Sequence, residues 1–157
     1  MIACLQRVLS ASVTVPGETG ARLEVGAIDR GLLVFLGVAK GDTEADVRRL
    51  AERVAGYRCF PSEDGSKPID RSARDLDLEM LVVSQFTLCA DTKKGMRPGF
   101  EPAARPEVAE PLYEQFVALL RAQSVRRVAT GRFGADMRVA LVNDGPVTLL
   151  LRTGESR

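Results

Sequence analysis

The stretch that decides the fold is residues 31–57, GLLVFLGVAKGDTEADVRRLAERVAGY. Its first part, Gly31–Val38, is a short and almost wholly apolar run bounded by turn residues, which is typical of a buried β-strand. Its second part begins with Asp42 and Thr43, either of which can cap a helix, and runs to Tyr57 with apolar residues at helical spacing. A buried strand followed by an amphipathic helix predicts a mixed α/β domain.

The sequence on both sides of this stretch carries further strand patterns and one more helix. Residues 2–15 and 22–28 flank a Pro- and Gly-containing break, which predicts a β-hairpin. Further elements are expected as strands at 81–88, 125–129, 137–142 and 147–151, a helix at 107–122 and a polar surface loop at 61–77. The prediction is a mixed α/β (α+β) fold with a β-sheet or barrel-like core and two amphipathic helices.

Composition indicates one globular domain spanning residues 1–157, with 45% hydrophobic and 27% charged residues. The net charge of +1 argues against wholesale coating of nucleic acid, although a local basic strip can still bind one segment of a nucleic acid. We expect a cytoplasmic protein with no membrane partner, because there is no signal-peptide pattern and no apolar run near the roughly 20 residues that span a bilayer. The three cysteines, Cys4, Cys59 and Cys89, are odd in number and widely spaced, which favours reduced thiols.

The sequence contains no histidine. This excludes His-based catalytic triads, His-assisted cysteine nucleophiles and His-bearing zinc sites. No plausible cluster of metal ligands, phosphate-cradling glycine loop or dinucleotide fingerprint is present either, so we expect no metal and no cofactor. An enzyme made from this chain has to use backbone dipoles, hydroxyls, carboxylates or groups of its own substrate.

Two short segments differ from a plain core pattern. In Ser84-Gln85-Phe86-Thr87-Leu88, strand alternation would place a polar group on each face of an otherwise apolar strand. The alternative interpretation is a strand that runs out to the surface, where polar residues are free. The second segment, Asn143 to Thr148 (NDGPVT), has the composition of a turn between two strands. Its Gly145–Pro146 bond can be cis or trans, and the sequence does not decide which.

Taken together, these segments resemble the two signature motifs of the D-aminoacyl-tRNA deacylase family, Ser-Gln-Phe-Thr-Leu and Asn-x-Gly-Pro-Val-Thr. Both occur without substitution, at 84–88 and 143–148. The resemblance covers nearly the whole chain in the right order, with further matches at 6–8, 11–13, 90–98 and 130–137. Cys89 stands where the family more often has a small alanine-like residue.

The resemblance implies a homodimeric hydrolase that cleaves the ester between tRNA and a D-amino acid, with active sites at the dimer interface. It implies that Gly145-Pro146 is cis and reaches into the partner subunit's pocket, where two backbone carbonyls exclude L side chains and admit D ones. Achiral glycyl-tRNA should then also be cleaved. On the same basis we expect Asn143, Met137 and Ala135 in the substrate pocket.

The resemblance places catalysis at Ser84, Gln85, Phe86 and Thr87. Backbone N–H groups near Phe86 and Thr87 would stabilise the oxyanion, at roughly 3–4 kcal/mol per well-placed donor, and the 2′-hydroxyl of the terminal adenosine would assist the attack. The Thr87 hydroxyl as nucleophile is the alternative, although no base is evident beside it. The basic residues Lys93, Lys94, Arg97 and Arg132 are candidates for contacts with acceptor-stem phosphates, with a solvated surface role as the alternative.

Two rival functions stay open on the sequence. One is a sister deacylase of animals that removes mischarged L-alanine, whose first motif lacks the Ser-Gln-Phe-Thr order found here. The other is a non-catalytic nucleic-acid-binding module, since relatives in this family have been linked to DNA replication origins. That module would bind uncharged nucleic acid tightly without turnover, and the near-neutral charge argues against it.

Overall fold

The computed structural model describes residues 1–18, 20–123 and 125–153. Its elements in chain order are β1 (Ile2–Pro16), β2 (Arg22–Ile28), β3 (Gly31–Gly37), α1 (Glu44–Gly56), β4 (Glu79–Ser84), the 3₁₀ helix η1 (Phe86–Cys89), α2 (Pro106–Arg121), β5 (Arg127–Thr130) and β6 (Arg138–Arg152). The mixed α/β architecture with two helices confirms the expectation from residues 31–57.

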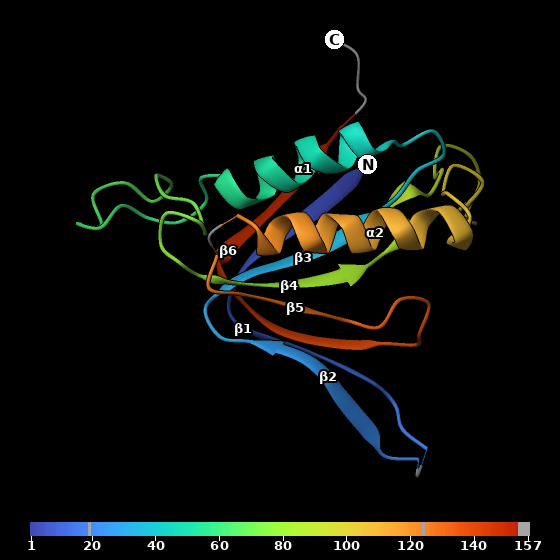
Figure 1. Ribbon diagram of the computed structural model, residues 1–157, viewed down its shortest axis with the longest axis horizontal. Coiled ribbons are helices and arrows are strands. Elements are labelled where there is room, and N and C mark those ends of the chain that lie inside the picture. The colour runs from blue at the N-terminus through green and yellow to red at the C-terminus, as the bar shows by residue number, and fades with distance from the viewer. Residues whose placement is uncertain (19, 124, 154–157) are drawn as a thin grey trace.

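The strands form one strongly curved sheet in the order β2-β1-β3-β4-β5, with β6 paired to β1. β1 is antiparallel to β2, β3 and β6, and the predicted hairpin of β1 and β2 is present. The other core strands, β3, β4 and β5, run parallel. β1 changes neighbours along its length: residues 2–8 pair with β3 and residues 11–16 pair with β2. The β1–β2 hairpin therefore swings away from the flat part of the sheet (Figure 1) and gives the core its barrel-like curl.

The two helices lie side by side over one face of the sheet (Figure 1). α1 starts where the sequence predicts, because Asp46 accepts hydrogen bonds from both the Thr43 amide (3.0 Å) and the Thr43 hydroxyl (2.8 Å). These bonds lower the pKa of the Asp46 carboxyl. The apolar face of α1 is fully buried, as its spacing predicts, at Val47, Leu50, Ala51 and Val54.

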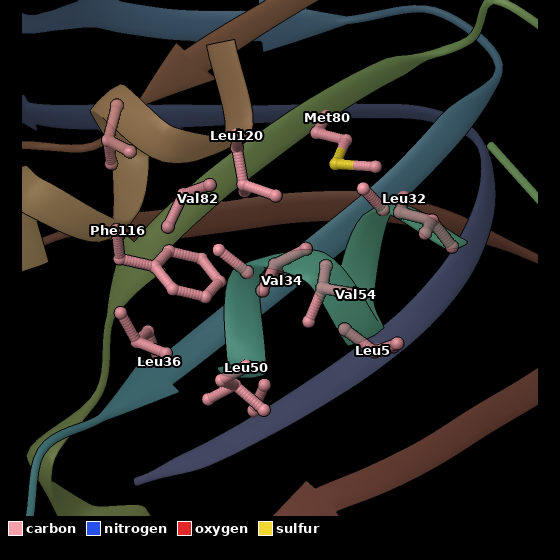
Figure 2. Close-up of a cluster of buried hydrophobic side chains, with 14 of the residues drawn as sticks. Leu5, Leu32, Val34, Leu36, Leu50, Val54, Met80, Val82, Phe116 and Leu120 are labelled. Carbon is pink, nitrogen blue, oxygen red and sulfur yellow. The ribbon is translucent and has the colours of Figure 1, made fainter. Parts of the chain in front are cut away.

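Each face of the sheet has its own hydrophobic core. Leu32, Val34 and Leu36 of β3 point toward the helices and pack with Phe116 and Leu120 of α2 (Figure 2). The alternate side chains of β3 and β4, Leu33, Leu81 and Val83, point to the other face, on the inside of the curved sheet. There they pack with Val8 and Val13 of β1 and Ile28 of β2. The almost wholly apolar composition of residues 31–38 follows from this, since a strand buried on both faces has no polar side.

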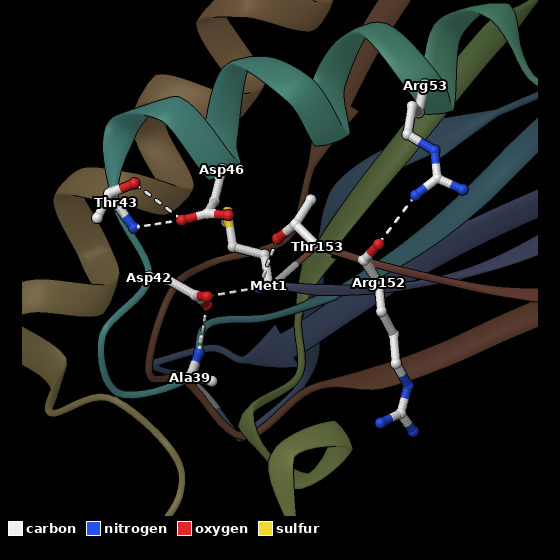
Figure 3. A network of polar contacts seen from close by, with 8 residues as sticks. All are labelled: Met1, Ala39, Asp42, Thr43, Asp46, Arg53, Arg152 and Thr153. Carbon is white, nitrogen blue, oxygen red and sulfur yellow. Dashed lines mark hydrogen bonds and ion pairs between the residues drawn. The ribbon is translucent and has the colours of Figure 1, made fainter. Parts of the chain in front are cut away.

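A polar network ties the start of β1 to the turn between β3 and α1 (Figure 3). The Met1 amino group contacts the Asp42 carboxylate and donates to the Thr153 hydroxyl (2.8 Å), and Asp42 also accepts from the Ala39 amide (2.7 Å). Arg53 of α1 donates to the Arg152 carbonyl at the end of β6 (2.8 Å). Asp42 therefore holds the turn between β3 and α1 to the start of β1, and Arg53 separately ties α1 to β6.

The structure departs from the predicted elements in two places. The strand expected at 81–88 ends at Ser84 and is followed by η1. The strands expected at 137–142 and 147–151 are one continuous strand, β6, so the segment between them is not a turn. Both departures fall on the two segments that carry the family motifs. No helix in the described part of the chain is long and apolar enough to cross a bilayer.

Candidate active site

A cavity of about 670 Å³ opens where the parallel strands β3, β4 and β5 end. The carboxyl ends of parallel strands meet at one edge of a sheet, and the loops that follow them form the usual binding crevice of such sheets. Three loops and the first turn of α2 surround this cavity. Its mostly apolar wall includes Leu36, Val83, Phe86, Phe100, Ala109 and Phe133.

The Ser84–Cys89 segment forms one side of the cavity and departs from the predicted strand. The Gln85 amide still donates to the Leu36 carbonyl (2.8 Å), which is the last sheet-like bond before the chain turns into η1. This turn packs closely against Gly37, where an added Cβ would lie 3.0 Å from the Leu88 Cβ and 3.1 Å from the Gln85 carbonyl oxygen. The glycine at position 37 therefore allows the 3₁₀ turn to lie against β3, and strand alternation does not apply beyond Ser84.

The first residues of this segment face the cavity. Ser84, Gln85 and Phe86 line it, whereas the exposed Thr87 is not among its lining residues. The Gln85 amide group donates a hydrogen bond to the Thr87 hydroxyl. The Phe86 ring is 55% exposed and packs edge-on against Phe100, with 5.1 Å between ring centroids. The first amide groups of a 3₁₀ helix have no acceptor within the helix. Within the described part of the chain no other hydrogen bond engages the Phe86 or Thr87 amide, so both are available to bind an oxygen atom.

The loop after β5 forms the opposite side of the cavity and contains two predicted pocket residues, Ala135 and Met137. Gly131 gives Met137 room to fold back, because a Cβ at Gly131 would lie 2.7 Å from the Met137 sulfur. Phe133 packs against Tyr113 of α2, with 5.7 Å between ring centroids. The Tyr113 hydroxyl in turn donates to the Val82 carbonyl (3.0 Å) in the sheet. Sequence reasoning assigned no role to Tyr113, whose signal was its place on the inward face of the helix.

A second brace on this loop comes from Arg22 at the start of β2. Its guanidinium donates to the Asp136 carbonyl (3.1 Å) and lies 3.4 Å from the Asp136 carboxylate. The same group donates to the carbonyl (2.8 Å) and the hydroxyl (3.0 Å) of Thr14 on β1. The hairpin of β1 and β2 thus holds the loop after β5, a long-range contact with no local sequence signal.

The 143–148 segment is a wide bulge within β6, which corrects the predicted turn. Val8 pairs with Asn143 and Gln6 pairs with Thr148, so residues 144–147 arch out between two consecutive paired positions of β1. The Gly145–Pro146 peptide bond is cis, and both residues are exposed. The chain turns outward here without leaving the sheet because the strands on either side of the bulge keep their pairing with β1.

Side chains from β1 and β6 brace this bulge. Arg7 donates from Nε to the Asp144 carbonyl (3.1 Å), lies 3.0 Å from the Asp144 carboxylate, and donates from Nη1 to the Cys59 carbonyl (2.8 Å). Asn143 accepts from the Val147 amide (3.1 Å) and donates to the Thr148 hydroxyl (3.1 Å). Backbone groups that a bulge would leave unpaired are therefore partly satisfied by side chains.

The structure does not bring all the predicted site residues together within one chain. Ser84, Gln85, Phe86, Ala135 and Met137 line the cavity, but among the described residues Asn143, Gly145 and Pro146 are not part of its wall. The basic candidates are all exposed. Lys93, Lys94 and Arg97 occupy a loop closed by the pairing of Asp91 with Gly99 (2.8 and 2.9 Å), and Arg132 lies beside Phe133 on the cavity loop.

The cysteines show no sign of activation. Burial raises the pKa of the Cys89 thiol, and burial raises the pKa of Cys59 to about 11, so both are protonated near neutral pH. All three cysteines are free. Across residues 1–18, 20–123 and 125–153, no group of three or more Cys, Asp or Glu side chains is placed to hold a metal ion.

Known proteins resemble this chain over nearly its whole length. The profile of the family described as D-Tyr-tRNA(Tyr) deacylase matches residues 4–152. Proteins named D-aminoacyl-tRNA deacylase are 54% identical in Pectobacterium carotovorum (98% of this chain, 100% of that protein) and 56% identical in Roseiflexus sp. (96% and 92%). A solved structure described as c-Myc DNA Unwinding Element Binding Protein superposes with a TM-score of 0.89 at 39% identity, covering 98% of this chain and 99% of that one.

A second solved structure, described as a probable eukaryotic D-amino acid tRNA deacylase, has a TM-score of 0.79 over 96% of this chain and 97% of that one. At 17% identity it shows the fold alone. The fold is thus shared with these solved structures, and the sequence is similar to enzymes named for hydrolysis of aminoacyl-tRNA. The chain belongs to the D-Tyr-tRNA(Tyr) deacylase family.

Proposed function

We propose that this protein hydrolyses the ester of D-aminoacyl-tRNA, and of glycyl-tRNA, releasing the free amino acid and tRNA. The observation that carries this proposal is the cavity itself, because Ser84, Gln85 and Phe86 of the first family motif form one side of it and Met137 the other. Relatives more than half identical over the full length carry the corresponding name. The reaction takes place in the cytoplasm, where aminoacyl-tRNA is used.

The proposed chemistry uses the backbone and the substrate. The ester carbonyl lies against the start of η1, and the N–H groups of Phe86 and Thr87 stabilise the tetrahedral oxyanion. The 2′-hydroxyl of the terminal adenosine assists the attack of water on the ester carbonyl. The substrate has this role because the chain has no histidine that could act as a base. Gln85 binds the Thr87 hydroxyl, which favours a positioning role for Thr87 over that of nucleophile.

The proposed selectivity needs a second copy of the chain. Gly145 and Pro146 are exposed and stand apart from the cavity of their own chain, so they reach a cavity only in a partner. The paired strands β1 and β6 also expose large apolar side chains, with Leu9, Val142 and Leu150 each half exposed or more. In the homodimer, backbone carbonyls of the bulge exclude an L side chain and leave room for a D one.

The proposed tRNA contacts lie outside the cavity. Lys93, Lys94 and Arg97 sit on the exposed loop that follows η1, and Arg132 sits on the loop across the cavity. Cations on both sides of the entrance suit an acceptor stem that enters between them, because phosphate contacts orient a nucleic acid without reading its sequence.

The decisive test compares hydrolysis of D-tyrosyl-tRNA, L-tyrosyl-tRNA and glycyl-tRNA by the purified protein, with and without a chelator. Loss of the D-tyrosyl and glycyl esters only, unaffected by chelation, supports the proposal. If all three esters persist while uncharged tRNA or DNA binds tightly, a binding function is correct instead, as the name of one structural neighbour would suggest.

The role of Thr87 is tested separately by Thr87→Ala under single-turnover conditions. Substantial retained activity is expected if the backbone and the RNA carry the chemistry. Complete loss with intact folding and tRNA binding would make the hydroxyl the nucleophile.

A further inference from the structure

Two cations, Lys40 and Arg105, belong to the cavity wall. Lys40 follows β3, and Arg105 immediately precedes α2. The two segments run side by side: the Lys40 amide donates to the Pro102 carbonyl (2.8 Å), and the Ala104 amide donates to the Val38 carbonyl (2.9 Å). In this short antiparallel pairing Lys40 lies opposite Pro102 at one end and Arg105 follows Ala104 at the other, and both residues line the same cavity.

The backbone that carries these cations is well fixed. On the Lys40 side, Asp42 binds the Ala39 amide and contacts the Met1 amino group (Figure 3). On the Arg105 side, the Ala109 amide of α2 donates to the Arg105 carbonyl (2.9 Å). The side chains themselves are exposed. A fixed backbone with an exposed cation is suited to binding an anion that arrives from solution.

Neither cation has a partner within the described part of the chain, since no ion pair or hydrogen bond involves either side chain there. Arg22, which braces the far side of the cavity, contrasts with them because its guanidinium is occupied by Thr14 and Asp136. Two acids, Glu101 and Asp136, also line the cavity, and the Asp136 carboxylate is paired with Arg22. Lys40 and Arg105 therefore stand against one remaining carboxylate, which leaves a net positive charge on this part of the wall.

Two parts of the cavity wall therefore differ in chemistry. The part at Gln85 and Phe86 offers amide groups for a reacting carbonyl, and the part with Lys40 and Arg105 offers positive charge. A ligand that contacts both carries an ester and an anion. The last nucleotide of an aminoacyl-tRNA has this form, because its ribose carries the ester on one side and, through its 5′ oxygen, the phosphate that joins it to the preceding nucleotide.

We propose that Lys40 and Arg105 bind the phosphate that links the terminal nucleotide of the substrate to the one before it. This rests on the proposed deacylase function. The contact fixes the direction in which the terminal nucleotide enters, with its ester toward η1. It is separate from the cations of the 91–99 loop and Arg132, which are assigned to the acceptor stem. Charge-assisted bonds of Lys and Arg to phosphate oxygens supply the affinity.

The test uses two small substrates that differ only in this phosphate: 3′-O-D-tyrosyl-adenosine, and the same ester carrying a 5′-methylphosphate. Lys40→Gln and Arg105→Gln are compared with the wild-type protein and with Arg49→Gln, which removes an exposed cation of α1 outside the cavity wall. Each cavity variant is expected to raise KM about tenfold for the phosphorylated ester. The kcat for that ester, and both constants for the unphosphorylated ester, should stay within about twofold of wild type.

Equal losses on both substrates, or no loss on the phosphorylated one, would overturn the assignment. A binding measurement separates it from the proposed reaction, using calorimetry with adenosine 5′-methylphosphate and with adenosine. Tighter binding of the phosphate compound by the wild-type protein, lost in both variants, supports the phosphate site even if neither ester is cleaved. Equal binding of the two compounds by the wild-type protein overturns it even if both esters are cleaved.

Discussion

The Arg7 guanidinium of β1 holds Asp144 of β6 by two groups at once, the carbonyl at 3.1 Å and the carboxylate at 3.0 Å. The Nη1 group of the same guanidinium donates to the Cys59 carbonyl in the segment after α1 (2.8 Å). The Arg7 side chain is only 11% exposed. One side chain thus connects the bulge that carries Gly145 and Pro146 to the body of the domain.

We predict that Arg7→Ala lowers kcat/KM for D-tyrosyl-tRNA by at least about tenfold and the free energy of unfolding by about 1.5–3 kcal/mol, because hydrogen bonds of a charged, part-buried group are lost. Arg7→Lys keeps the charge but not the fork of donors, so it should recover only part of both losses. Kinetics and urea unfolding check the prediction, with Arg49→Ala as control. Wild-type turnover in Arg7→Ala would show that the bulge needs no support from this side chain.

Gly37→Ala is predicted to act on the 3₁₀ turn. The added Cβ would meet the Leu88 Cβ at 3.0 Å and the Gln85 carbonyl at 3.1 Å, so η1 has to move by a few tenths of an ångström. Because η1 supplies the proposed oxyanion donors, we expect kcat to fall by about a factor of ten or more, with a stability loss of about 1–3 kcal/mol.

The matched control is Gly56→Ala at the end of α1, where the nearest atom to the new Cβ is the movable tip of the Arg74 side chain (3.1 Å). That variant should keep wild-type turnover. Single-turnover rates and thermal unfolding of both variants give the comparison. Unchanged kcat in Gly37→Ala would separate catalysis from the position of η1.

Cys89→Ala is predicted to keep kcat within about threefold of wild type. Burial holds the pKa of this thiol above its usual value, so the unreactive protonated form persists at neutral pH, and the chain has no histidine to act as base. The loss of a small buried side chain should cost about 1 kcal/mol of stability. Single-turnover hydrolysis before and after treatment with iodoacetamide at pH 7 is the measurement; inactivation by the reagent in the wild type but not in Cys89→Ala would contradict it.

The sequence predicted those parts of the fold whose signal is local. Burial of β3 on both faces leaves a local signal, the apolar run of Leu32 to Leu36, and the capping bond leaves another at Thr43. Strand and helix therefore appear where expected. The predicted strand at 81–88 was too long, because the alternation of residues carries no information about neighbours in other strands. The neighbour that matters is Gly37 of β3, which leaves space for η1. The same limit applies to β6, where turn-forming residues occupy a bulge because β1 continues to pair on both sides.

The candidate site shows the same division. Motif residues such as Gln85 and Met137 were found from the sequence and line the cavity. Residues that brace it through distant contacts were not, because Arg22 reaches Asp136 and Tyr113 reaches Val82 across separations that no local pattern encodes. Lys40 and Arg105 line one cavity because residues 38–40 pair with 102–104, a long-range contact that no local pattern encodes.

The hydroxyl of Tyr113 is buried and donates to the Val82 carbonyl (3.0 Å), which also accepts from the Gly131 amide (3.0 Å). Tyr113→Phe therefore leaves no carbonyl without a donor, and we predict a modest stability loss of about 1 kcal/mol at pH 7. Turnover should fall less than threefold, since the ring that supports Phe133 is retained.

The pH dependence of this difference follows from burial, which raises the pKa of Tyr113 to about 12 from an ordinary value of 10.0. The folded state favours the neutral phenol, so the stability that Tyr113 contributes is complete below pH 10 and is lost as the pH rises toward 12. The urea midpoint of the wild type should thus exceed that of Tyr113→Phe at pH 7, and the gap should close or reverse by pH 11–12. Tyr57→Phe, at the chain's other tyrosine, is the matched control for titration of the remaining groups. A gap that stays constant from pH 7 to pH 12 would mean that the buried phenol ionises no differently in the folded and unfolded protein.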